Sequence, residues 1–439
     1  MILVTGGAGF IGSVLIKELN LLGREDIILV DRLAESEKWS NLSGLKYHDY
    51  FNCDEFLHGI VDEVIESVSF IFHIGACSAT TETNMDYLMR NNVEYSKVLF
   101  ELATERNIPI VYASSAATYG DGESGYSDDH SKVGELKPLN RYGYSKQLVD
   151  EWVLKQDKHP TQWFGLKYFN VYGPNEYHKG DMRSLVHKAY GQILDSGQVK
   201  LFKSHRDDYE DGKQLRDFIY VKDIARAMIE MMNPSSANFS GIYNLGTGKA
   251  RSFLDLMKAT FKAMGRDENI EFIDMPQRFR NQYQYYTQAD MKKFKEFLPH
   301  FKFTSLEDGV EDYVKNYPLP VWMKPLRFIF PLLIKYLTKK DQQAAKSVDF
   351  FVSNSDFVGQ RIKKFYNRKS TTIYPCIDTQ QFALDEPAEG SRLETQGYYL
   401  ALGRFIPYKN FDLLVKTFVK NKRPLKLGGI GPELEKCKR

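Results

Sequence analysis

Three glycines at a spacing of three follow directly on an apolar run at the start of the chain. Residues Ile2–Thr5 have the composition of a buried strand, and Gly6, Gly9 and Gly12 come next, where a helix can begin. Such glycines permit a tight turn, close approach of a diphosphate to backbone N–H groups, and packing of the helix on the strand. The same triplet also occurs in turns that bind no ligand. The loop alone therefore predicts the start of a βαβ unit, and a dinucleotide site needs support from other residues.

Further strand-like runs predict the rest of an α/β fold. They recur with helix-length segments between them, which is typical of a Rossmann-like, doubly wound parallel sheet. The runs lie at Ile27–Val30, Phe70–Ile74 and Ile108–Ala113 and, less regularly, at Phe164–Phe169, Phe218–Val221, Ile242–Leu245 and Ile270–Ile273. We therefore expect a dinucleotide-binding domain over residues 1–165, with part of the next lobe interleaved after it, and a smaller α/β substrate-binding lobe over residues 166–318.

The remaining residues, 319–439, are expected to form a separate segment. Pro318 and Pro320 end a predicted helix over Leu306–Asn316, and the charge changes there, since the tail has 22 Lys and Arg against 11 Asp and Glu. A basic tail with ordinary strand and helix patterns favours a folded piece over a nucleic-acid-binding arm, so no nucleic acid partner is expected.

Composition excludes several classes of protein. The four cysteines lie far apart without a C-x-x-C pair, and the nine histidines have no metal-ligand spacing, so neither disulfides nor a metal site is predicted. The longest apolar stretch, Phe328–Ile334, is far shorter than the ~20 residues that span a bilayer, so no integral membrane segment is expected. With no room for a signal peptide ahead of the glycine loop, we expect a cytoplasmic protein.

Charged residues after the second strand bear on the cofactor. Asp31 stands about twenty residues past the glycine loop, where an acidic side chain holds a ribose hydroxyl. Arg32 and Lys38 are placed for a 2′-phosphate, although both are also ordinary charges for a solvated loop. These residues favour NADP and leave NAD possible.

Hydroxyl groups and a lysine suggest redox chemistry on an alcohol. Ser115 follows a predicted strand, at the sheet edge where a nicotinamide would lie, and Tyr142 precedes Lys146 by four residues, which places both on one helix face. A phenol of pKa about 10 is a weak base at neutral pH, but a neighbouring ammonium favours the phenolate. Hydride abstraction from an alcohol needs such a base.

These elements together resemble the extended short-chain dehydrogenases, and the likeness is closest to the heptose 6-epimerases of that family over residues 1–318. It is carried by Gly75–Glu82, Asn91-Asn92, Tyr112–Gly120, Tyr168–Pro174, His178–Gly180 and Tyr285–Asp290. The resemblance implies NADP-dependent epimerisation at carbon 6 of an ADP-heptose. It implies that Tyr142 and Lys179 are acid/base groups, that Ser115 polarises the reacting oxygen and that Lys146 grips the ribose.

The resemblance also implies the ligand contacts. Cofactor contacts are expected from Gly6, Gly9, Phe10, Ile11, Gly12, Asp31, Arg32, Lys38, Gly75, Ala76, Cys77, Ser78, Asn91, Lys146 and Val171. Substrate contacts are expected from Ser115, Asn170, Asp181, Phe202, Ser204, Arg216 and Tyr283. Arg216 is suited to the diphosphate of a sugar nucleotide. A homo-oligomer is expected as well.

A second base is chemically reasonable for this reaction. Epimerisation returns hydride to the opposite face of the ketone, and one phenol cannot stand opposite the hydride in both poses. Lys179 can serve if burial lowers its pKa, whereas from the residues alone it is equally well a phosphate-binding or surface lysine.

Some residues depart from the family pattern. Cys53 and Ile74 replace a usual lysine and a usual acid, and Lys188, Lys203 and His205 differ near the substrate. An Asp-rich insertion, Arg206–Gln214, precedes Arg216. These changes bear on substrate and cofactor preference more than on reaction class. His73 and His178 are interpreted as packing or loop residues.

The tail resembles part of a GT-B retaining glycosyltransferase. The match lies at Ala345–Asn354, Thr372–Asp378 and Tyr398–Asn410, with Arg404 and Lys409 at the basic pair that usually holds a donor diphosphate. Most of the first lobe and the acidic part of the second are absent from the sequence, so this incomplete α/β segment is given no activity.

Three other functions stay open. One is another nucleotide-sugar epimerase or dehydratase of the same family, although Ala116-Ala117-Thr118 lacks the acid that a dehydratase usually carries there. Another is a bifunctional chain with an active transferase tail. The least favoured is a non-catalytic nucleotide-binding module, because the Ser, Tyr and Lys set is complete.

Overall fold

The computed structural model describes residues 1–57, 61–280, 283–316, 338–374, 399–402, 411–422 and 424–428. The chain divides into two compact units, residues 1–327 and 328–439. The expected boundary at Tyr317–Pro320 lies outside the described residues.

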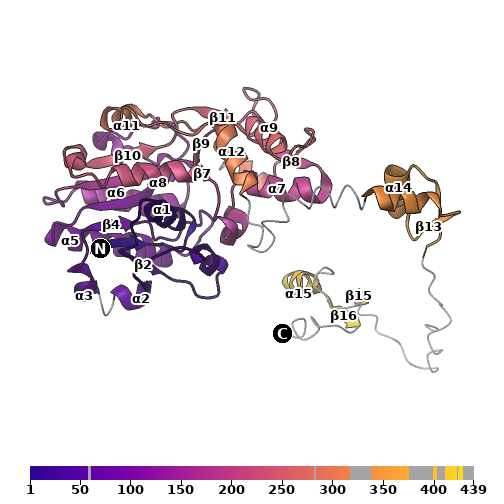
Figure 1. Ribbon diagram of the computed structural model, residues 1–439, viewed down its shortest axis with the longest axis horizontal. Helices are drawn as coiled ribbons and strands as arrows, with labels where there is room; N and C mark the ends of the chain where they lie inside the picture. Colours follow the sequence, from indigo (N-terminus) through magenta and orange to yellow (C-terminus); the bar gives the residue numbers. More distant parts are fainter. Residues whose placement is uncertain are drawn as a thin grey trace. The chain divides into compact units, whose positions relative to one another are not determined.

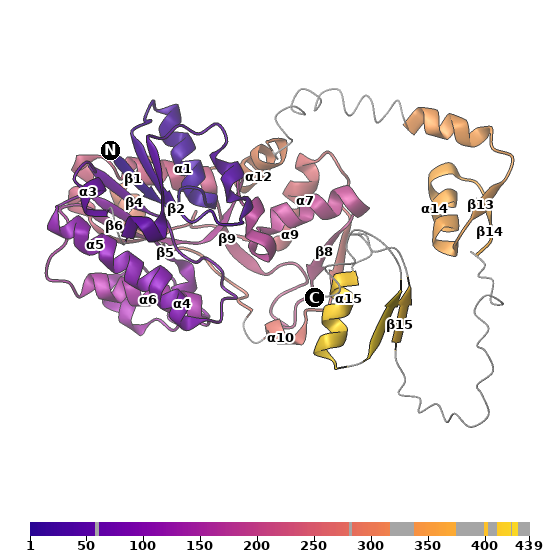
Figure 2. The ribbon, with the colours of Figure 1, turned by 90° about the horizontal axis from the view of Figure 1, so that it is seen from below.

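A seven-stranded parallel sheet is the centre of the first unit (Figures 1 and 2). Its strands are β1 (Ile2–Thr5), β2 (Ile27–Asp31), β3 (Asp49–Asn52), β4 (Phe70–His73), β5 (Ile110–Ser115), β6 (Trp163–Tyr168) and β10 (Gly241–Leu245). Their order is β10-β6-β5-β4-β1-β2-β3, so the chain reverses direction across the sheet between β1 and β4. Ligands of doubly wound sheets bind at the carboxyl ends of the strands beside such a reversal.

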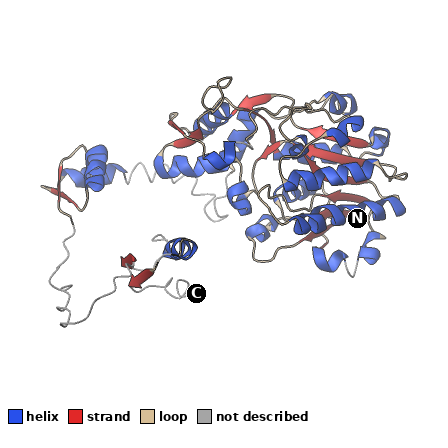
Figure 3. Ribbon diagram, turned by 180° about the vertical axis from the view of Figure 1, so that it is seen from behind, coloured by secondary structure: helices blue, strands red, loops and turns tan. Residues whose placement is uncertain are grey.

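Alternate residues of each central strand point to two separate apolar cores. Ile2 and Val4 join the core on one face of the sheet, whereas Leu3 joins the core on the other face. On the first face α1 (Phe10–Leu21) packs against α8 (Val221–Glu230), and on the second lie α5 (Tyr95–Glu105) and α6 (Arg141–Leu154). Figure 3 shows the helices on both sides of the strands. The predicted Rossmann-like α/β class is therefore confirmed.

The chain passes between the central sheet and the second lobe more than once. β6 continues across the expected division at residue 165, and β10, from within the expected substrate lobe, pairs in parallel with β6. A parallel neighbour needs a crossover connection, so the chain leaves the sheet after β6 and returns to it 73 residues later, counted from Tyr168 to Gly241. β3 was missed by the sequence analysis, because this edge strand (DYFN) lacks an apolar run.

The remaining described strands of the first unit form two small sheets. β7 (Asn170–Tyr172), β9 (Leu215–Tyr220) and β11 (Ala250–Ser252) form one, and β8 (Val199–Phe202) pairs with β12 (Ile270–Ile273) in the other. The helices here are α7 (Leu185–Ser196), α9 (Phe253–Ala263), α10 (Gln277–Arg280) and α12 (Leu306–Lys315), whereas α11 (Lys292–Phe297) packs against β10 of the central sheet. α8 begins at Val221, where the strand-like run Phe218–Val221 ends.

Short helical segments complete the first unit. They are α2 (Cys53–Glu55), α3 (Val61–Ile65), α4 (Met85–Leu88), a π-helical turn at Met89–Glu94, and 3₁₀ turns at Glu37–Leu42, Ala116–Tyr119, His130–Glu135, Tyr177–Met182 and Pro234–Phe239.

The second unit contains two small βαβ arrangements. β13 (Phe351–Ser353) pairs in parallel with β14 (Ser370–Thr372) around α14 (Asp356–Tyr366), and β15 (Tyr399–Leu402) pairs in parallel with β16 (Leu425–Gly428) around α15 (Phe411–Lys420). Phe350 is 88% exposed, so these pieces bury little of their apolar surface. Arg404, Lys409, Leu384–Gln396 and Gly429–Gly431 lie outside the described residues. Within the described ranges, no helix has the length and apolar character needed to cross a membrane.

Candidate active site

The glycine loop joins β1 to α1 with almost no free space. Gly6 has a φ of +68°, and a Cβ there would come within 2.7 Å of the backbone of Gly75; a Cβ on Gly12 would come within 2.2 Å of the Gly6 carbonyl oxygen. No side chain caps α1, whose N-cap is Gly9. The loop therefore offers the uncapped N-terminus of a helix beside bare backbone, which suits the diphosphate of a dinucleotide.

Asp31, at the carboxyl end of β2, is the centre of a polar cluster beside the loop. Its carboxylate accepts hydrogen bonds from the backbone N–H of Ala8 at 2.9 Å and from the Lys38 ammonium at 2.6 Å. Arg32 contacts the Asp54 carboxylate and the Asn91 side-chain oxygen. The structure thus brings together four residues that the sequence assigned to the cofactor: Asp31, Arg32, Lys38 and Asn91.

Asn41, which the sequence analysis did not select, links the glycine loop to the loop that carries Lys179. Its side-chain amide donates to the Ala8 carbonyl at 3.0 Å and to the Asn175 carbonyl at 3.1 Å, and it lies 3.4 Å from Nδ1 of His178. Burial lowers the pKa of His178 to about 4. A lone asparagine in a polar loop gives no sequence signal for such a link.

Ser115 and Tyr142 meet at the end of β5. Ser115 caps the 3₁₀ turn that follows, accepting from the backbone N–H of Ala117 at 3.1 Å. Tyr142 lies in the first turn of α6, whose N-cap Asn140 accepts from the N–H of Gly143. Burial raises the pKa of Tyr142, and a side-chain hydrogen bond with Ser115 opposes this rise. The two hydroxyls therefore lie close enough to contact one substrate oxygen, which is what a base and an oxygen-polarising group require.

Lys146 lies one turn further along α6. It is 3% exposed, and its ammonium donates to the Ala113 carbonyl at 2.8 Å. Burial lowers the pKa of Lys146 to about 8, against the opposing charge of Asp150. The charge on Lys146 is therefore lost just above neutral pH, the range in which Tyr142 would have to act as a base.

Lys179 approaches from the other side of the glycine loop. It lies in the 3₁₀ turn Tyr177–Met182, and its ammonium stands 5.3 Å from the centroid of the Phe10 ring, in the first residue of α1. Burial lowers the pKa of Lys179, and the charge of Glu176 partly offsets this. The direction matches what a second acid/base group needs.

The loop after β4 is fixed by a residue that the ligand assignments omitted. Asn92 accepts from the backbone N–H of Cys77 at 2.8 Å and donates to the Cys77 carbonyl at 3.1 Å. The same amide donates to the Ser145 hydroxyl of α6 at 2.9 Å. This ties the Gly75–Ser78 loop to the helix that carries Tyr142. His73 is buried behind it, between Thr5 and Ser96, as a packing residue.

Arg216 on β9 is a buried cation without a carboxylate partner among the described residues. Its guanidinium lies 5.4 Å from the ring centroids of both Phe253 and Tyr283 and donates to the backbone carbonyls of Leu215 and Gln284. Burial lowers the pKa of Arg216. An enclosed positive charge held only by carbonyls and aromatic faces suits an anionic ligand.

The other expected substrate residues come from several elements of the lobe. Asn170 and Val171 open β7, Asp181 lies in the turn of Lys179, Phe202 ends β8, and Ser204 donates its N–H to Asp211 of the insertion at 2.7 Å. Asn170 also approaches Thr287 at 3.3 Å.

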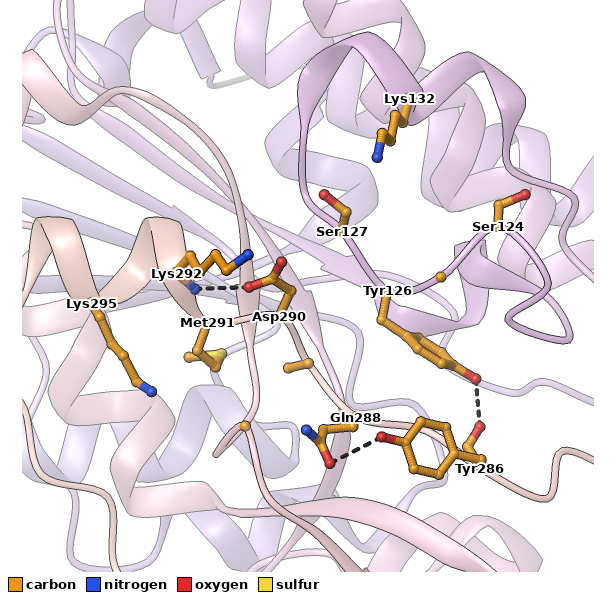
Figure 4. Close-up of a pocket in the computed structure, with 13 residues that line it drawn as sticks. Ser124, Tyr126, Ser127, Lys132, Tyr286, Gln288, Asp290, Met291, Lys292 and Lys295 are labelled. Atoms are coloured by element: carbon orange, nitrogen blue, oxygen red, sulfur yellow. Dashed lines mark hydrogen bonds between the residues drawn. The ribbon is translucent and has the colours of Figure 1, made fainter.

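A pocket of about 530 Å³ lies elsewhere on this unit (Figure 4). It is bounded by Tyr126, which donates to the Tyr286 carbonyl, and by Gln288 and Asp290. None of Ser115, Tyr142, Lys146 or Lys179 lines it. Volume alone therefore does not locate the chemistry. Among the residues that the structure describes, no group of three or more His, Cys, Asp or Glu could hold a metal ion.

This fold and site define a class of nicotinamide-dependent enzyme that acts on sugar nucleotides. Residues 2–246 match the sequence profile of the NAD dependent epimerase/dehydratase family, and the chain belongs to that family.

More specific likenesses extend past this range. The chain is 51% identical over 321 residues to the ADP-L-glycero-D-manno-heptose-6-epimerase of Nitratidesulfovibrio vulgaris strain DP4 and 48% identical over 326 residues to that of Fusobacterium nucleatum, covering 72% of this chain and 98% of each relative. The crystal structure of the Helicobacter pylori enzyme of that name aligns with a TM-score of 0.61 at 29% identity, over 72% of this chain and 95% of the other.

Proposed function

We propose that the first unit epimerises carbon 6 of the heptose in ADP-glycero-manno-heptose through a transient ketone. The identity of about half over almost the full length of two heptose 6-epimerases carries this proposal. The product would be ADP-L-glycero-D-manno-heptose for lipopolysaccharide core or related surface glycans.

The site residues have distinct tasks in this reaction. A bound nicotinamide nucleotide supplies a hydride acceptor. Tyr142 takes the proton of the C6 hydroxyl while Ser115 holds its oxygen. This division of labour is supported by the Ser115 hydroxyl, which opposes the rise that burial causes in the pKa of Tyr142. Lys146 keeps a positive charge beside the phenolate and grips the ribose. Lys179 exchanges the proton of the opposite epimer, supported by its burial and by its place beside Phe10 at the start of α1.

Substrate binding is assigned to the second lobe. Arg216 would pair with the diphosphate, supported by its enclosure without a carboxylate partner in the described part of the chain. Asn170, Asp181, Phe202, Ser204 and Tyr283 would surround the nucleotide and sugar. These residues come from different strands and turns of the second lobe.

The cofactor is proposed to be NADP. Lys38 and Arg32 flank Asp31 at the place where a 2′-phosphate attaches to the adenosine ribose, which supports this choice. The remaining dinucleotide contacts follow the glycine loop, the Gly75–Ser78 loop, Asn91 and Val171. A cytoplasmic homo-oligomer is the proposed working form.

The tail, residues 319–439, is proposed to be a glycosyltransferase-like segment without activity of its own. Its two βαβ pieces are compatible with fragments of an α/β transferase. A bifunctional chain would instead require the tail to transfer sugar.

The decisive experiment offers the purified chain a panel of ADP-, GDP- and UDP-sugars and follows each by NMR. We expect ADP-D-glycero-D-manno-heptose and its L-glycero epimer to interconvert, with no net consumption of cofactor. Turnover of a UDP-hexose in place of the heptose would assign another epimerase of the family, and loss of water would assign a dehydratase.

A further inference from the structure

A buried ion pair lies directly behind the candidate active site. Asp150 of α6 and Lys167 of β6 approach to 2.5 Å, and both side chains are 0% exposed. Neither residue belongs to the sets assigned above to cofactor or substrate. Taking two charges out of water is costly unless their geometry and further hydrogen bonds compensate. The contacts of the pair therefore indicate what it holds in place.

The pair binds residues on both sides of Ser115. Asp150 accepts from the Ser114 hydroxyl at 2.7 Å and from the Tyr112 hydroxyl at 3.2 Å. Lys167 donates to the Thr118 hydroxyl at 2.8 Å, and that hydroxyl donates to the Ser115 carbonyl at 2.9 Å. The backbone at Ser115 is thus held on both sides, by Asp150 at the preceding residue and by Lys167 at the following turn.

Three successive turns of α6 are fastened to three successive residues at the end of β5. Tyr142, Lys146 and Asp150 recur every four residues and so share one helix face. Lys146 donates to the Ala113 carbonyl and Asp150 accepts from the Ser114 hydroxyl, while Tyr142 lies near enough to Ser115 for that hydroxyl to lower its pKa. Only the Asp150 contact is shared with a neighbouring strand, through Lys167.

We propose that Asp150 and Lys167 are positioning residues for the proton transfer at Tyr142. The pair fixes the alignment of α6 along the end of β5, so that Ser115 and Tyr142 can contact the same substrate oxygen. In addition, the Asp150 carboxylate places a negative charge near the Lys146 ammonium. This inference rests on the proposed function, whose active site it completes.

The charge of Asp150 acts on Lys146 from one helical turn away. It raises the pKa of Lys146 against the effect of burial. Without it the pKa of Lys146 falls further, so the ammonium that favours the phenolate is lost at a lower pH. The other titratable groups facing these two residues are Lys167 on β6, Tyr112 on β5, Tyr119 and His130 on the 3₁₀ turns, His73 on β4, and Cys77.

Four variants of the full chain separate a positioning role from stability alone. Asp150→Asn and Lys167→Met each leave one member of the pair alone, the double variant removes both charges, and Asp223→Asn is a control. Asp223 is also 0% exposed and paired with a cation, Arg226, but it lies on α8. The measurements are Tm, bound cofactor, kcat for ADP-heptose against pH, and a crystal structure of each variant.

The expected pattern differs between stability and catalysis. Each single variant of the pair lowers Tm by roughly 6–20 °C, and the double variant recovers most of this loss, because breaking a buried pair costs more than replacing it. In contrast, kcat stays about 100-fold low in both Asp150→Asn and the double variant, since a misplacement near 1 Å has that effect. The alkaline limb of their kcat profile moves to lower pH, whereas Asp223→Asn loses Tm and keeps the wild-type limb.

Two results would overturn the positioning role. One is a double variant with wild-type kcat and an unmoved alkaline limb. The other is an Asp150→Asn crystal structure in which the Ser115 and Tyr142 hydroxyls keep their wild-type positions. If the wild-type chain fails to convert ADP-heptose while the variant structures still separate Ser115 from Tyr142, the proposed function is wrong and the positioning role stands.

Discussion

The Lys146 ammonium donates a hydrogen bond to the Ala113 carbonyl at 2.8 Å, two residues before Ser115. This contact holds a cation at the end of β5, on the helix that carries Tyr142 in its first turn. With a pKa lowered by burial to about 8, Lys146 carries its charge at neutral pH and loses it slightly above.

We therefore expect kcat to fall as the pH rises through about 8. Deprotonation of Lys146 removes the charge that favours the Tyr142 phenolate. The effect on folding has the opposite sign: between about pH 8 and the unfolded pKa near 10.4, the unfolded chain binds more protons at this position, so the contribution of Lys146 to the free energy of unfolding increases with pH. Activity and urea denaturation measured together from pH 6 to 10 test this. A kcat that stays flat beyond pH 9 would contradict it.

Removing either proposed base should stop turnover without emptying the site. Tyr142→Phe and Lys179→Met each delete a proton-transfer group, and such groups contribute about 10²–10⁴-fold to the rate. We expect at least that loss of kcat for both epimers while nicotinamide absorbance stays with the purified protein. Lys258→Met, on the exposed side of α9, is the matched lysine control. Normal turnover in Lys179→Met would leave Tyr142 as the single base.

Arg216 should matter for binding more than for folding. Its guanidinium is enclosed by Phe253 and Tyr283 without a carboxylate partner among the described residues. Replacement by methionine removes the cost of an enclosed charge, so we expect no decrease in Tm. The Kd of ADP, measured by calorimetry, should increase about 10- to 100-fold, as expected for losing a charged hydrogen-bonded contact. A large drop in Tm with unchanged ADP affinity would assign Arg216 to the core instead.

Cofactor choice tests the cluster around Asp31. Lys38→Ala with Arg32→Ala removes two positive charges beside the adenosine ribose, while Asp31 keeps its bond from Ala8. Affinity for NADP should fall about tenfold or more, and affinity for NAD should change little, because only NADP carries the 2′-phosphate. Equal losses for both nucleotides would mean that the two residues hold the loop and not the phosphate.

Sequence patterns were sufficient where one local signal determines the structure. The Ile2–Gly12 segment predicted the first strand, the glycine turn and the helix after it, and the spacing of Tyr142 and Lys146 predicted that both lie on one helix. Each of these features depends on residues close together in the chain. Asn41 and the Asp150–Lys167 pair were not found, and Asn92 was quoted only as part of the Asn91-Asn92 motif, without a role. Each of these residues joins segments distant in sequence through a polar side chain. The edge strand β3 was missed for lack of an apolar pattern. β10 was expected as a strand, but its parallel pairing with β6 was not, because strand pairing at long range leaves no local mark.

The tail should be dispensable for epimerisation. Every candidate site residue lies between Gly6 and Tyr283, within the first compact unit of residues 1–327. In the described part of the second unit, large apolar side chains such as Phe350 and Phe357 are exposed. Exposed side chains of this kind favour aggregation. A chain shortened to residues 1–327 should therefore keep kcat and KM for ADP-heptose within about twofold and gain solubility. The shortened chain and the full chain are compared by NMR for turnover and by light scattering for solubility. Loss of turnover in a shortened chain that is still folded by circular dichroism would contradict this expectation, because the tail would then contribute to the site.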